Sequence, residues 1–404
     1  LNIDNTGNVK ITTFDASAVT GSASNVTFAS ANTTTTASVS ITGGAGADVL
    51  TGGATKDTIN GGAGNDTLAS GAGIDTMIGG AGNDTFQFLT ANLASTDTIT
   101  GGAGTDDLEM TDAATLVDAE FTLATSIETI TVAAATNSIT LGTLAAAAGV
   151  VTFTGSTGDD SLTVGSGFTN NLTVTGGNGA DTITLTDYTG TATLTGGTGI
   201  DTYVLGAGTE TINAGTGSVA DVFKVASAAA LASTDTITGG AGTDVITLTA
   251  AQTLVDSQLT GVNTVETINQ SGNVALTITL GAQAQEAGIT AVTGGNGAMT
   301  LDASAMTTGL TITGGTGIDK ITGTQGNDTI DGGGTATNIF TFGATAALNG
   351  YDDYDDNLTA TDRVEFSGFL SGGSFHTTVI QYNGATDVDI TNKVVMLAGG
   401  ASDN

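Results

Sequence analysis

Apolar and polar residues alternate along most of the chain, and threonine holds many of the polar positions. Between residues 43 and 87 the pattern repeats with a period of nine, with one large apolar side chain at the same place in each repeat: Leu50, Ile59, Leu68, Met77 and Phe86. Short alternation of this kind is typical of a strand with one buried face. It predicts short strands that point these side chains inward and are joined by tight turns.

Later segments keep the strand pattern at a longer spacing. Examples are SIETITV (126–132), VVTFTGS (150–156), NLTVTGG (171–177) and TATLTGG (191–197). The spacing from Gly176 to Gly196 suits one full turn of a parallel β-helix. Only AAAAG (145–149) and AQAQEAG (282–288) indicate helix, as single short turns. We therefore expect an all-β chain, folded as a right-handed parallel β-helix or β-roll solenoid.

The turns between the strands have their own pattern of glycine and aspartate. Five consecutive units run from Gly43 to Gln87: GGAGADVLT, GGATKDTIN, GGAGNDTLA, SGAGIDTMI and GGAGNDTFQ. GGxGxD recurs at Gly101, Gly176, Gly196, Gly239 and Gly314, and looser copies begin at Gly155 and Gly323. Glycine permits positive φ and a close approach of carbonyl groups to an ion. Aspartate supplies the hard oxygen ligand that Ca²⁺ prefers, so the pattern indicates calcium-binding turns.

These units resemble the RTX ("repeats in toxin") nonapeptide GGxGxDxUx, in which U is a large apolar residue. The resemblance implies that each unit forms a turn that binds Ca²⁺ followed by a short strand, and that successive units wind a parallel β-roll. Turns on one side of such a roll alternate, so each turn stacks on the turn two units along the chain. We expect Asp48 to share an ion with the turn of Asp66, Asp57 with that of Asp75, and Asp66 with that of Asp84. The alternative is that these aspartates only cap their turns by hydrogen bonding.

The candidate calcium ligands are the acidic residues at the aspartate position of each unit. They are Asp48, Asp57, Asp66, Asp75, Asp84, Asp106, Asp160, Asp181, Asp201, Asp244, Asp319 and Asp328, together with Asp97, Asp235, Asp221 and Glu210. Asp97, Asp235 and also Asp362 belong to glycine-poor units, and for these three the choice between ligand and turn cap stays open. Several Ca²⁺ ions are the only cofactor that we expect.

A second, longer repeat overlies the nonapeptides. LASTDTITGGAGTD occurs at 93–106 and again at 231–244, and the match continues to Glu128-Thr-Ile130 and Glu266-Thr-Ile268. The sequence thus predicts a duplicated module. The alignment also shows where the motif has changed: Met299 stands in the place of Asp160, and Asn338 in that of Asp84 and Asp221. Asn338 could still offer a carbonyl oxygen.

The composition of the chain excludes several classes of protein. The chain has 404 residues with 40 Asp and Glu against 6 Lys and Arg, so its formal net charge is −34, yet 39% of its residues are apolar. Disorder goes with low hydrophobicity, so a folded chain that recruits cations is favoured. Such a charge repels phosphate and excludes nucleic acid as a partner. No apolar run in the sequence is long enough to predict a membrane span.

Catalytic motifs are missing from the sequence. Cysteine is absent, the only histidine is His376, and GxSxG does not occur. Thiol chemistry, HExxH metal sites and the nucleophile elbow are thereby excluded. Counting carboxylates does not exclude a glycosidase pair, but a single arginine and 4% aromatic residues do not favour a sugar-cleaving site. We expect no enzyme, and His376 is interpreted as a surface or cap residue. Asp352, Asp353, Asp355 and Asp356 form an acidic patch that is either a further calcium site or a solvated loop.

We expect soft boundaries between the parts of such a solenoid, because each rung contacts only its neighbours. The expected parts are N-terminal rungs (1–42), a tandem RTX β-roll (43–109), β-helix rungs with scattered RTX turns (110–222), the duplicated module (223–342) and a C-terminal cap region (343–404). The chain begins at Leu1 without methionine or leader, so we expect a fragment or processed product.

Three functional classes compete among proteins with this kind of repeat. The resemblance favours a structural extracellular protein, a calcium-dependent component of a surface layer or matrix, exported by a type I system and located at the cell surface. The alternatives are the spacer of a secreted adhesin or biofilm protein and the secretion tail of an exported hydrolase. We expect the chain to bind copies of itself, in a lattice or filament, and a cell-surface polysaccharide is a further candidate partner.

Overall fold

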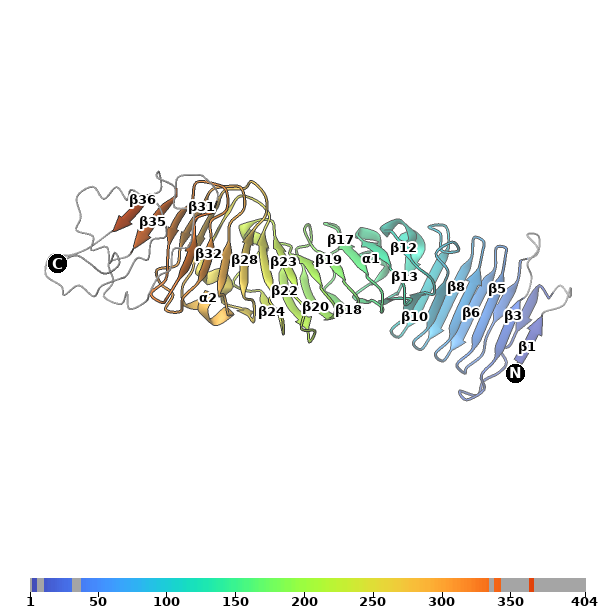
Figure 1. The fold of residues 1–404 in the computed structure, drawn as a ribbon. Helices are drawn as coiled ribbons and strands as arrows, with labels where there is room; N and C mark the ends of the chain where they lie inside the picture. The colour runs from blue at the N-terminus through green and yellow to red at the C-terminus, as the bar shows by residue number, and fades with distance from the viewer. Residues whose placement is uncertain (1, 6–10, 31–37, 334–337, 343–362, 367–404) are drawn as a thin grey trace, which may run out of the picture. The chain divides into compact units, whose positions relative to one another are not determined.

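The protein is a parallel β-solenoid, as the sequence predicts. The computed structural model describes residues 2–5, 11–30, 38–333, 338–342 and 363–366. Successive rungs pair in parallel, strand above strand, in each of two compact units (Figure 1). Unit 1 comprises Leu1–Asp201 and Gly206–Thr209, and unit 2 comprises Thr202–Leu205 and Glu210–Asn404.

Unit 1 contains strands of three parallel sheets. The strands of the first sheet are β1 (Asn2–Asn5), β3 (Thr27–Ser30), β5 (Val49–Gly53), β7 (Thr67–Gly71), β9 (Thr85–Phe88), β11 (Asp107–Met110), β14 (Thr129–Val132), β16 (Thr152–Thr154), β18 (Leu172–Asn178) and β20 (Thr191–Thr198). Those of the second are β2 (Thr13–Asp15), β4 (Ser40–Thr42), β6 (Thr58–Ala63), β8 (Thr76–Ala81), β10 (Thr98–Ala103) and β13 (Ala124–Thr125). Those of the third are β12 (Thr115–Leu116), β15 (Ser138–Leu141), β17 (Ser161–Val164) and β19 (Thr182–Thr184).

Unit 2 is built in the same way. One group of strands is β22 (Thr209–Gly215), β24 (Thr236–Thr238) and β27 (Val262–Asn263). A second is β21 (Thr202–Val204), β23 (Val222–Val225), β25 (Val245–Leu248), β28 (Thr267–Gln270), β30 (Ala291–Thr293), β32 (Thr311–Thr313) and β34 (Thr329–Asp331). A third is β26 (Gln252–Leu254), β29 (Leu276–Thr279), β31 (Met299–Asp302), β33 (Lys320–Thr322), β35 (Ile339–Phe342) and β36 (Arg363–Phe366).

The register confirms that stacked turns of the tandem block lie two nonapeptides apart. In the parallel first sheet Leu50 pairs with Leu68, and Leu68 pairs with Phe86. On the opposite side Ile59 pairs with Met77. All five of these side chains are 0% exposed, so the inward orientation expected from the alternation is also confirmed.

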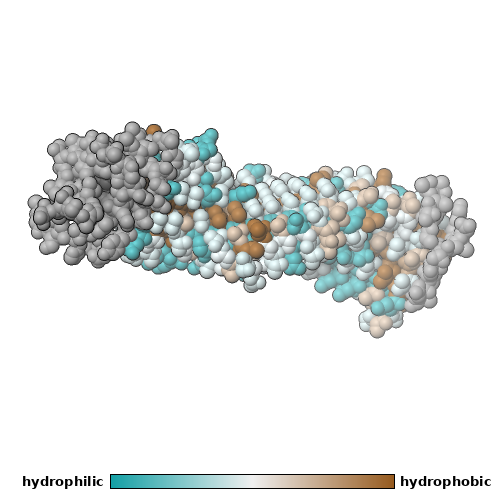
Figure 2. Space-filling view, in the orientation of Figure 1, coloured by the Kyte–Doolittle hydropathy of each residue, from teal (hydrophilic) through white to brown (hydrophobic). Residues whose placement is uncertain are grey.

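Outward positions are mostly polar. Threonine is frequent there because a β-branched side chain fits the pleated surface. On the face shown in Figure 2, hydrophilic and near-neutral residues cover most of the surface, and apolar residues appear only in small groups.

Short helices stand where a sheet ends. They are η1 (Asp118–Leu123), α1 (Thr143–Ala148), η2 (Ala228–Ala230), η3 (Asp256–Leu259) and α2 (Ala282–Ala287). Helices α1 and α2 confirm the two helical turns expected near 145–149 and 282–288. Each ends at a glycine in the left-handed region, Gly149 (φ 113°) and Gly288 (φ 98°), which stops the helix.

Helix α1 covers the end of the second sheet of unit 1. It contacts β13, the last strand of that sheet, and the N–H of Ile127 donates to the carbonyl of Ala148 (3.0 Å). In unit 2, α2 contacts β27 in the same way, and Val265 N–H donates to Ala287 O (3.0 Å). Both copies of the duplicated module therefore end a sheet at a helix.

Candidate calcium-binding turns

The predicted acidic ligands form ladders of buried carboxylates along the turns. In each ladder the backbone N–H of one acidic residue donates to Oδ1 of the acidic residue one rung later. Asp48 N–H donates to Asp66 (2.7 Å), Asp66 N–H to Asp84 (2.8 Å), and Asp84 N–H to Asp106 (2.8 Å). Oδ1 of each carboxylate thus accepts a backbone N–H of the turn one rung earlier. This agrees with the rule that buried polar groups are hydrogen-bonded.

The other turns of the tandem block form a second ladder. Asp57 N–H donates to Asp75 Oδ1 (2.8 Å) and Asp75 N–H to Asp97 Oδ1 (2.8 Å). The three pairs of turns expected to stack are therefore in contact, and in each the carboxylate of the later turn reaches the backbone of the earlier one.

The ladders continue in the longer rungs of both units. In unit 1 the N–H of Asp160 donates to Asp181 (2.8 Å), and that of Asp181 to Asp201 (2.9 Å). In unit 2 Asp221 donates to Asp244 (2.7 Å) and Glu210 to Asp235 (3.1 Å). Met299, which replaces an aspartate, still donates its N–H to Asp319 Oδ1 (2.8 Å).

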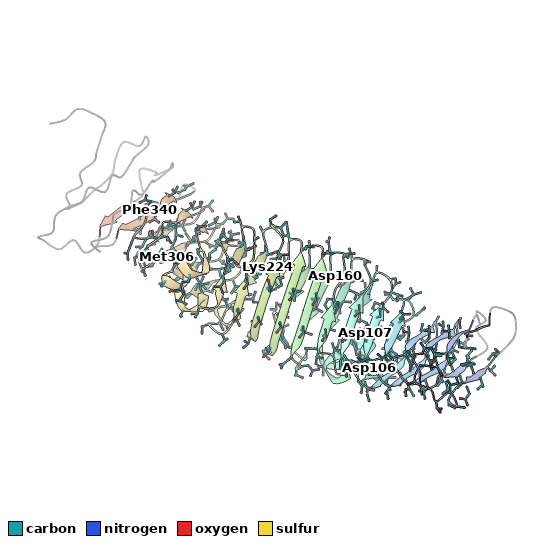
Figure 3. All side chains as sticks on the ribbon, turned by 90° about the horizontal axis from the view of Figure 1, so that it is seen from below. Asp106, Asp107, Asp160, Lys224, Met306 and Phe340 are labelled. Atoms are coloured by element: carbon teal, nitrogen blue, oxygen red, sulfur yellow. The ribbon has the colours of Figure 1, made fainter. Side chains whose placement is uncertain are left out.

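All sixteen predicted ligands are buried: Asp48, Asp57, Asp66, Asp75, Asp84, Asp97, Asp106, Asp160, Asp181, Asp201, Glu210, Asp221, Asp235, Asp244, Asp319 and Asp328. Asn338 is buried too, and its side-chain oxygen accepts the N–H of Asp319 (2.9 Å). Figure 3 labels Asp106 and Asp160, which belong to two ladders of unit 1. Asp352, Asp353, Asp355, Asp356, Asp362 and His376 lie outside the described residues.

In the Asp66 turn two oxygens converge on the first glycine, Gly61. A Cβ placed on Gly61 would overlap Oδ2 of Asp66, which belongs to the same turn, and would lie 2.7 Å from the carbonyl oxygen of Gly79, one rung later. Glycine at this position leaves the space open. A carboxylate oxygen and a carbonyl oxygen from the next rung thus line a small cradle.

The turns occur in two states, which differ at the residue four positions before the aspartate. In an open turn that residue is a glycine with positive φ, and the Oδ2 atom of the aspartate is buried without a hydrogen-bond partner. The open turns, each with its glycine, are those of Asp66 (Gly62), Asp75 (Gly71), Asp84 (Gly80), Asp106 (Gly102), Asp181 (Gly177), Asp244 (Gly240) and Asp319 (Gly315).

In a closed turn a backbone N–H donates a hydrogen bond to Oδ2 of the aspartate. Gly44 N–H donates to Asp48 Oδ2 (2.6 Å), Gly53 to Asp57 (2.5 Å), Ser156 to Asp160 (2.7 Å) and Thr324 to Asp328 (2.7 Å). None of these four donors has positive φ.

The φ angle explains why the two states exclude each other. It sets the orientation of the preceding peptide plane and therefore the direction of the N–H. Ser156 and Thr324 carry a side chain that disfavours positive φ, whereas Gly62 adopts φ 110° without cost. When this glycine has positive φ, its N–H thus points away from Oδ2 of the aspartate and does not donate a hydrogen bond to it.

Burial makes the open carboxylates resist ionisation. It raises the pKa of Asp66, Asp75 and Asp84 to about 6, although a backbone amide from the ladder opposes the shift. Burial likewise raises the pKa of Asp181 and Asp319 to about 6. A buried anion with an unused oxygen is a costly arrangement unless a cation neutralises it.

The glycine-poor positions behave as turn caps. Oδ2 of Asp97 accepts the N–H of Ala94 (2.8 Å), and Oδ2 of Asp235 accepts the N–H of Ala232 (2.7 Å). In both residues Oδ1 accepts the ladder amide as well. Both oxygens of Asp97 and Asp235 therefore have a backbone donor.

Three ladder residues were missed by the sequence analysis. Asn137 accepts the N–H of Ala114 (2.8 Å), and Glu128 and Glu266 accept those of Asp106 and Asp244 (2.8 Å each). None stands in a GGxGxD unit. The available signal was the duplicated module, which repeats Glu128-Thr-Ile130 as Glu266-Thr-Ile268.

The donor set fits Ca²⁺. Within the described residues no three His, Cys, Asp or Glu side chains converge on one point, so backbone carbonyls would have to supply most ligands. A single carboxylate with several carbonyl oxygens matches the hard, flexible shell of Ca²⁺ better than the octahedral shell of Mg²⁺. The unused Oδ2 atoms and the glycine cradles both support this assignment.

Stacked glycine–aspartate turns on a parallel solenoid define a class of calcium-binding repeat proteins. Five segments, residues 40–68, 61–87, 94–109, 229–250 and 311–336, match the sequence profile of the RTX calcium-binding nonapeptide repeat. The chain therefore carries RTX repeats, and such repeats bind several Ca²⁺ ions. A search of curated proteins gave no match. No helix in the described part of the chain is long and apolar enough to cross a membrane.

Proposed function

We propose that the protein is a structural component of the cell exterior, a calcium-stabilised solenoid that assembles into a surface layer or matrix. The observation that carries this proposal is the continuity of the repeat: in both units the described strands are rungs of a solenoid with buried carboxylate ladders. The RTX repeats support export from the cell, since proteins with them are typically secreted by type I systems.

Calcium has a defined structural task in this proposal. The open turns supply Oδ2 of their aspartates and carbonyl oxygens of the adjoining glycines, and the ion joins two stacked turns. The closed turns are weaker candidates because an amide already satisfies Oδ2. Asp97 and Asp235 are weaker still, because they lack the glycine turn. Ion binding then contributes directly to folding, since the ligands come together only in the solenoid.

Charge supports the same role. Self-repulsion at a net charge of −34 opposes a compact state, and bound Ca²⁺ offsets it. Neighbouring molecules with this charge also repel, so calcium would act between chains as well as within them. We assign no catalytic residue, and the role proposed is not enzymatic.

Assembly is tested on the folded protein at millimolar Ca²⁺. Light scattering across a concentration series should show growth in mass, and electron microscopy should show extended arrays that chelator disperses. Removal of Ca²⁺ at constant ionic strength, with Na⁺ as the replacement, controls for simple screening. Strictly monomeric protein at every concentration, with no array on the producing cells, would favour the spacer of an adhesin instead.

A further inference from the structure

Two ladders of glycine–aspartate turns, one in each unit, end on a glutamate outside the repeat pattern. In unit 1 the ladder runs from Asp84 to Asp106, and Asp106 then donates its N–H to Oε2 of Glu128 (2.8 Å). The matched RTX segments of this block end at residue 109, before Glu128.

The last aspartate of the block is in the open state. Asp106 is 0% exposed, and its Oδ2 has no hydrogen-bond partner. A Cβ on Gly101 would overlap both this Oδ2 and the carbonyl oxygen of Ser126. In the preceding turns the corresponding carbonyl belongs to a glycine of the next RTX unit, as Gly101 O does for the cradle at Gly79. Ser126 therefore stands where the first glycine of the next RTX turn stands in the earlier rungs, and no RTX turn follows it on this side.

Ser126 delivers this carbonyl from a left-handed conformation. Its φ is 55°, and among the described residues positive φ outside glycine occurs only at Ser126 and Thr264 (φ 50°). Such a conformation is disfavoured for residues with a Cβ. The surrounding rungs hold it in place: Ile127 N–H donates to Ala148 O on the next rung (3.0 Å).

The same arrangement recurs in unit 2. Asp244 is 0% exposed with an unpartnered Oδ2, and its N–H donates to Oε2 of Glu266 (2.8 Å). A Cβ on Gly239 would overlap Asp244 Oδ2 and the carbonyl oxygen of Thr264. The matched segment ends at residue 250, again before the glutamate. Two separate units thus build the same group of oxygens.

Charge indicates what this group binds. The ladder hydrogen bonds place the carboxylates of Asp106 and Glu128 on adjacent rungs, and likewise those of Asp244 and Glu266. Two adjacent carboxylates and a backbone carbonyl are hard oxygen donors that suit a divalent cation, and Ca²⁺ above all. The extra methylene of glutamate compensates for the short connection, since only one residue separates Ser126 from Glu128.

We propose that each of these two ladders ends in a calcium site completed from outside the repeat: Asp106, Ser126 O and Glu128 in unit 1, and Asp244, Thr264 O and Glu266 in unit 2. These sites rest on the proposed calcium-bound solenoid. Each ion would tie the last RTX turn to the first rung that lacks the repeat, where α1 or α2 begins to cover the sheet. The glutamates thereby close the calcium-bound roll at its end.

The test counts bound ions. Full-length protein is dialysed against Ca²⁺, and bound calcium per chain is measured by mass spectrometry of the metal. Glu128→Gln and Glu266→Gln should each lose one ion, and the double variant two. Glutamine keeps an oxygen that accepts the ladder N–H, so each variant should retain the fold. Glu286→Gln, on the exposed face of α2, makes the same change in charge and should keep every ion.

Calcium binding by the wild-type protein tests the proposed function, and calcium binding by the glutamate variants tests the terminal sites. If wild-type protein binds no calcium, the proposed function itself fails. If it binds calcium and Glu128→Gln keeps the full number, only the terminal sites are refuted. Should a glutamine variant not fold by circular dichroism, Glu128→Asp replaces it: the charge stays, the reach shortens, and weaker binding of one ion is expected. An unchanged titration of Glu128→Asp would contradict the proposal.

Discussion

The backbone N–H of Asp66 donates to Oδ1 of Asp84, one rung later, at 2.8 Å. The same carboxylate holds Oδ2, its other oxygen, buried without a partner. Oδ1 of Asp84 therefore stabilises the neighbouring rung, while Oδ2 of the same side chain is available to bind an ion. Loss of the ion and loss of the rung should consequently be coupled.

Calcium removal should unfold the repeat. Circular dichroism in excess chelator is expected to lose the β signal, because buried carboxylates and self-repulsion are left without cations. Millimolar Ca²⁺ should restore it, and Mg²⁺ should do so poorly because it demands tighter octahedral geometry. A β signal that persists in chelator would count against calcium-dependent folding.

Open and closed turns should differ in ion binding. Asp181 and Asp160 are consecutive members of one ladder, and only Asp181 is open. Asp181→Asn should lose one bound ion, because an amide replaces the unused Oδ2.

Asp160→Asn is the matched control. Its Oδ2 accepts the N–H of Ser156 (2.7 Å), so the variant should keep every ion while stability falls by about 1 kcal/mol for the lost hydrogen bond. Bound calcium and thermal unfolding distinguish the two variants. Equal ion loss in both would refute the distinction between open and closed turns.

Acid should stabilise the calcium-free fold. The pKa values of Asp66, Asp75 and Asp84 are raised to about 6 in the fold, above the value of 3.8 for an unperturbed aspartate. The folded state therefore binds more protons than the unfolded state between pH 4 and 6. This stability is present at low pH and is lost as pH rises through about 6.

The β signal in chelator should accordingly be stronger at pH 4.5 than at pH 7.5. Calcium affinity should change in the opposite direction, rising with pH as protons leave the ligands. Titrations at the two pH values, at equal ionic strength, measure both effects. A calcium affinity independent of pH would be inconsistent with these carboxylates as ligands.

The helix caps should contribute stability without calcium. Asp118 accepts the N–H groups of Gly142 (2.8 Å) and Ala145 (2.9 Å) at the start of α1. Asp118→Ala should weaken this region by about 2 kcal/mol, because buried helix amides lose a charged acceptor. Faster hydrogen exchange at Ala145, with an unchanged number of bound ions, is the expected readout. Asp187→Ala, at an exposed position, serves as the control.

Sequence periodicity predicted most of the fold because side-chain burial follows it directly. Leu50, Leu68 and Phe86 point inward for the reason the pattern gave: alternate residues of a strand face opposite sides. The stacking of Asp48 on Asp66 followed from the nonapeptide unit in the same way. The two short helices were visible as alanine-rich segments ending in glycine.

The state of a turn that has glycine four positions before its aspartate could not be predicted, since it depends on the neighbouring rung. Gly44 and Gly62 occupy the same place in identical GGAG sequences, but Gly44 lies against Val19 and Gly62 lies against Gly44. Only Gly62 adopts positive φ. Glu128 was missed for a related reason: it joins the ladder through a Ser126 conformation that no local pattern announces.

The carboxylate ladder has a direction, because every N–H in it points to a later residue. Removing the chain after Asp66 would leave the Asp48 link intact but deprive the Asp66 N–H of Asp84, its acceptor. Removing the chain before Asp66 would instead leave Oδ1 of its carboxylate without the Asp48 donor, and water can hydrate an exposed carboxylate easily. Rungs exposed by C-terminal truncation should therefore fray more than rungs exposed by N-terminal truncation, so the two ends of a carboxylate ladder are not equivalent.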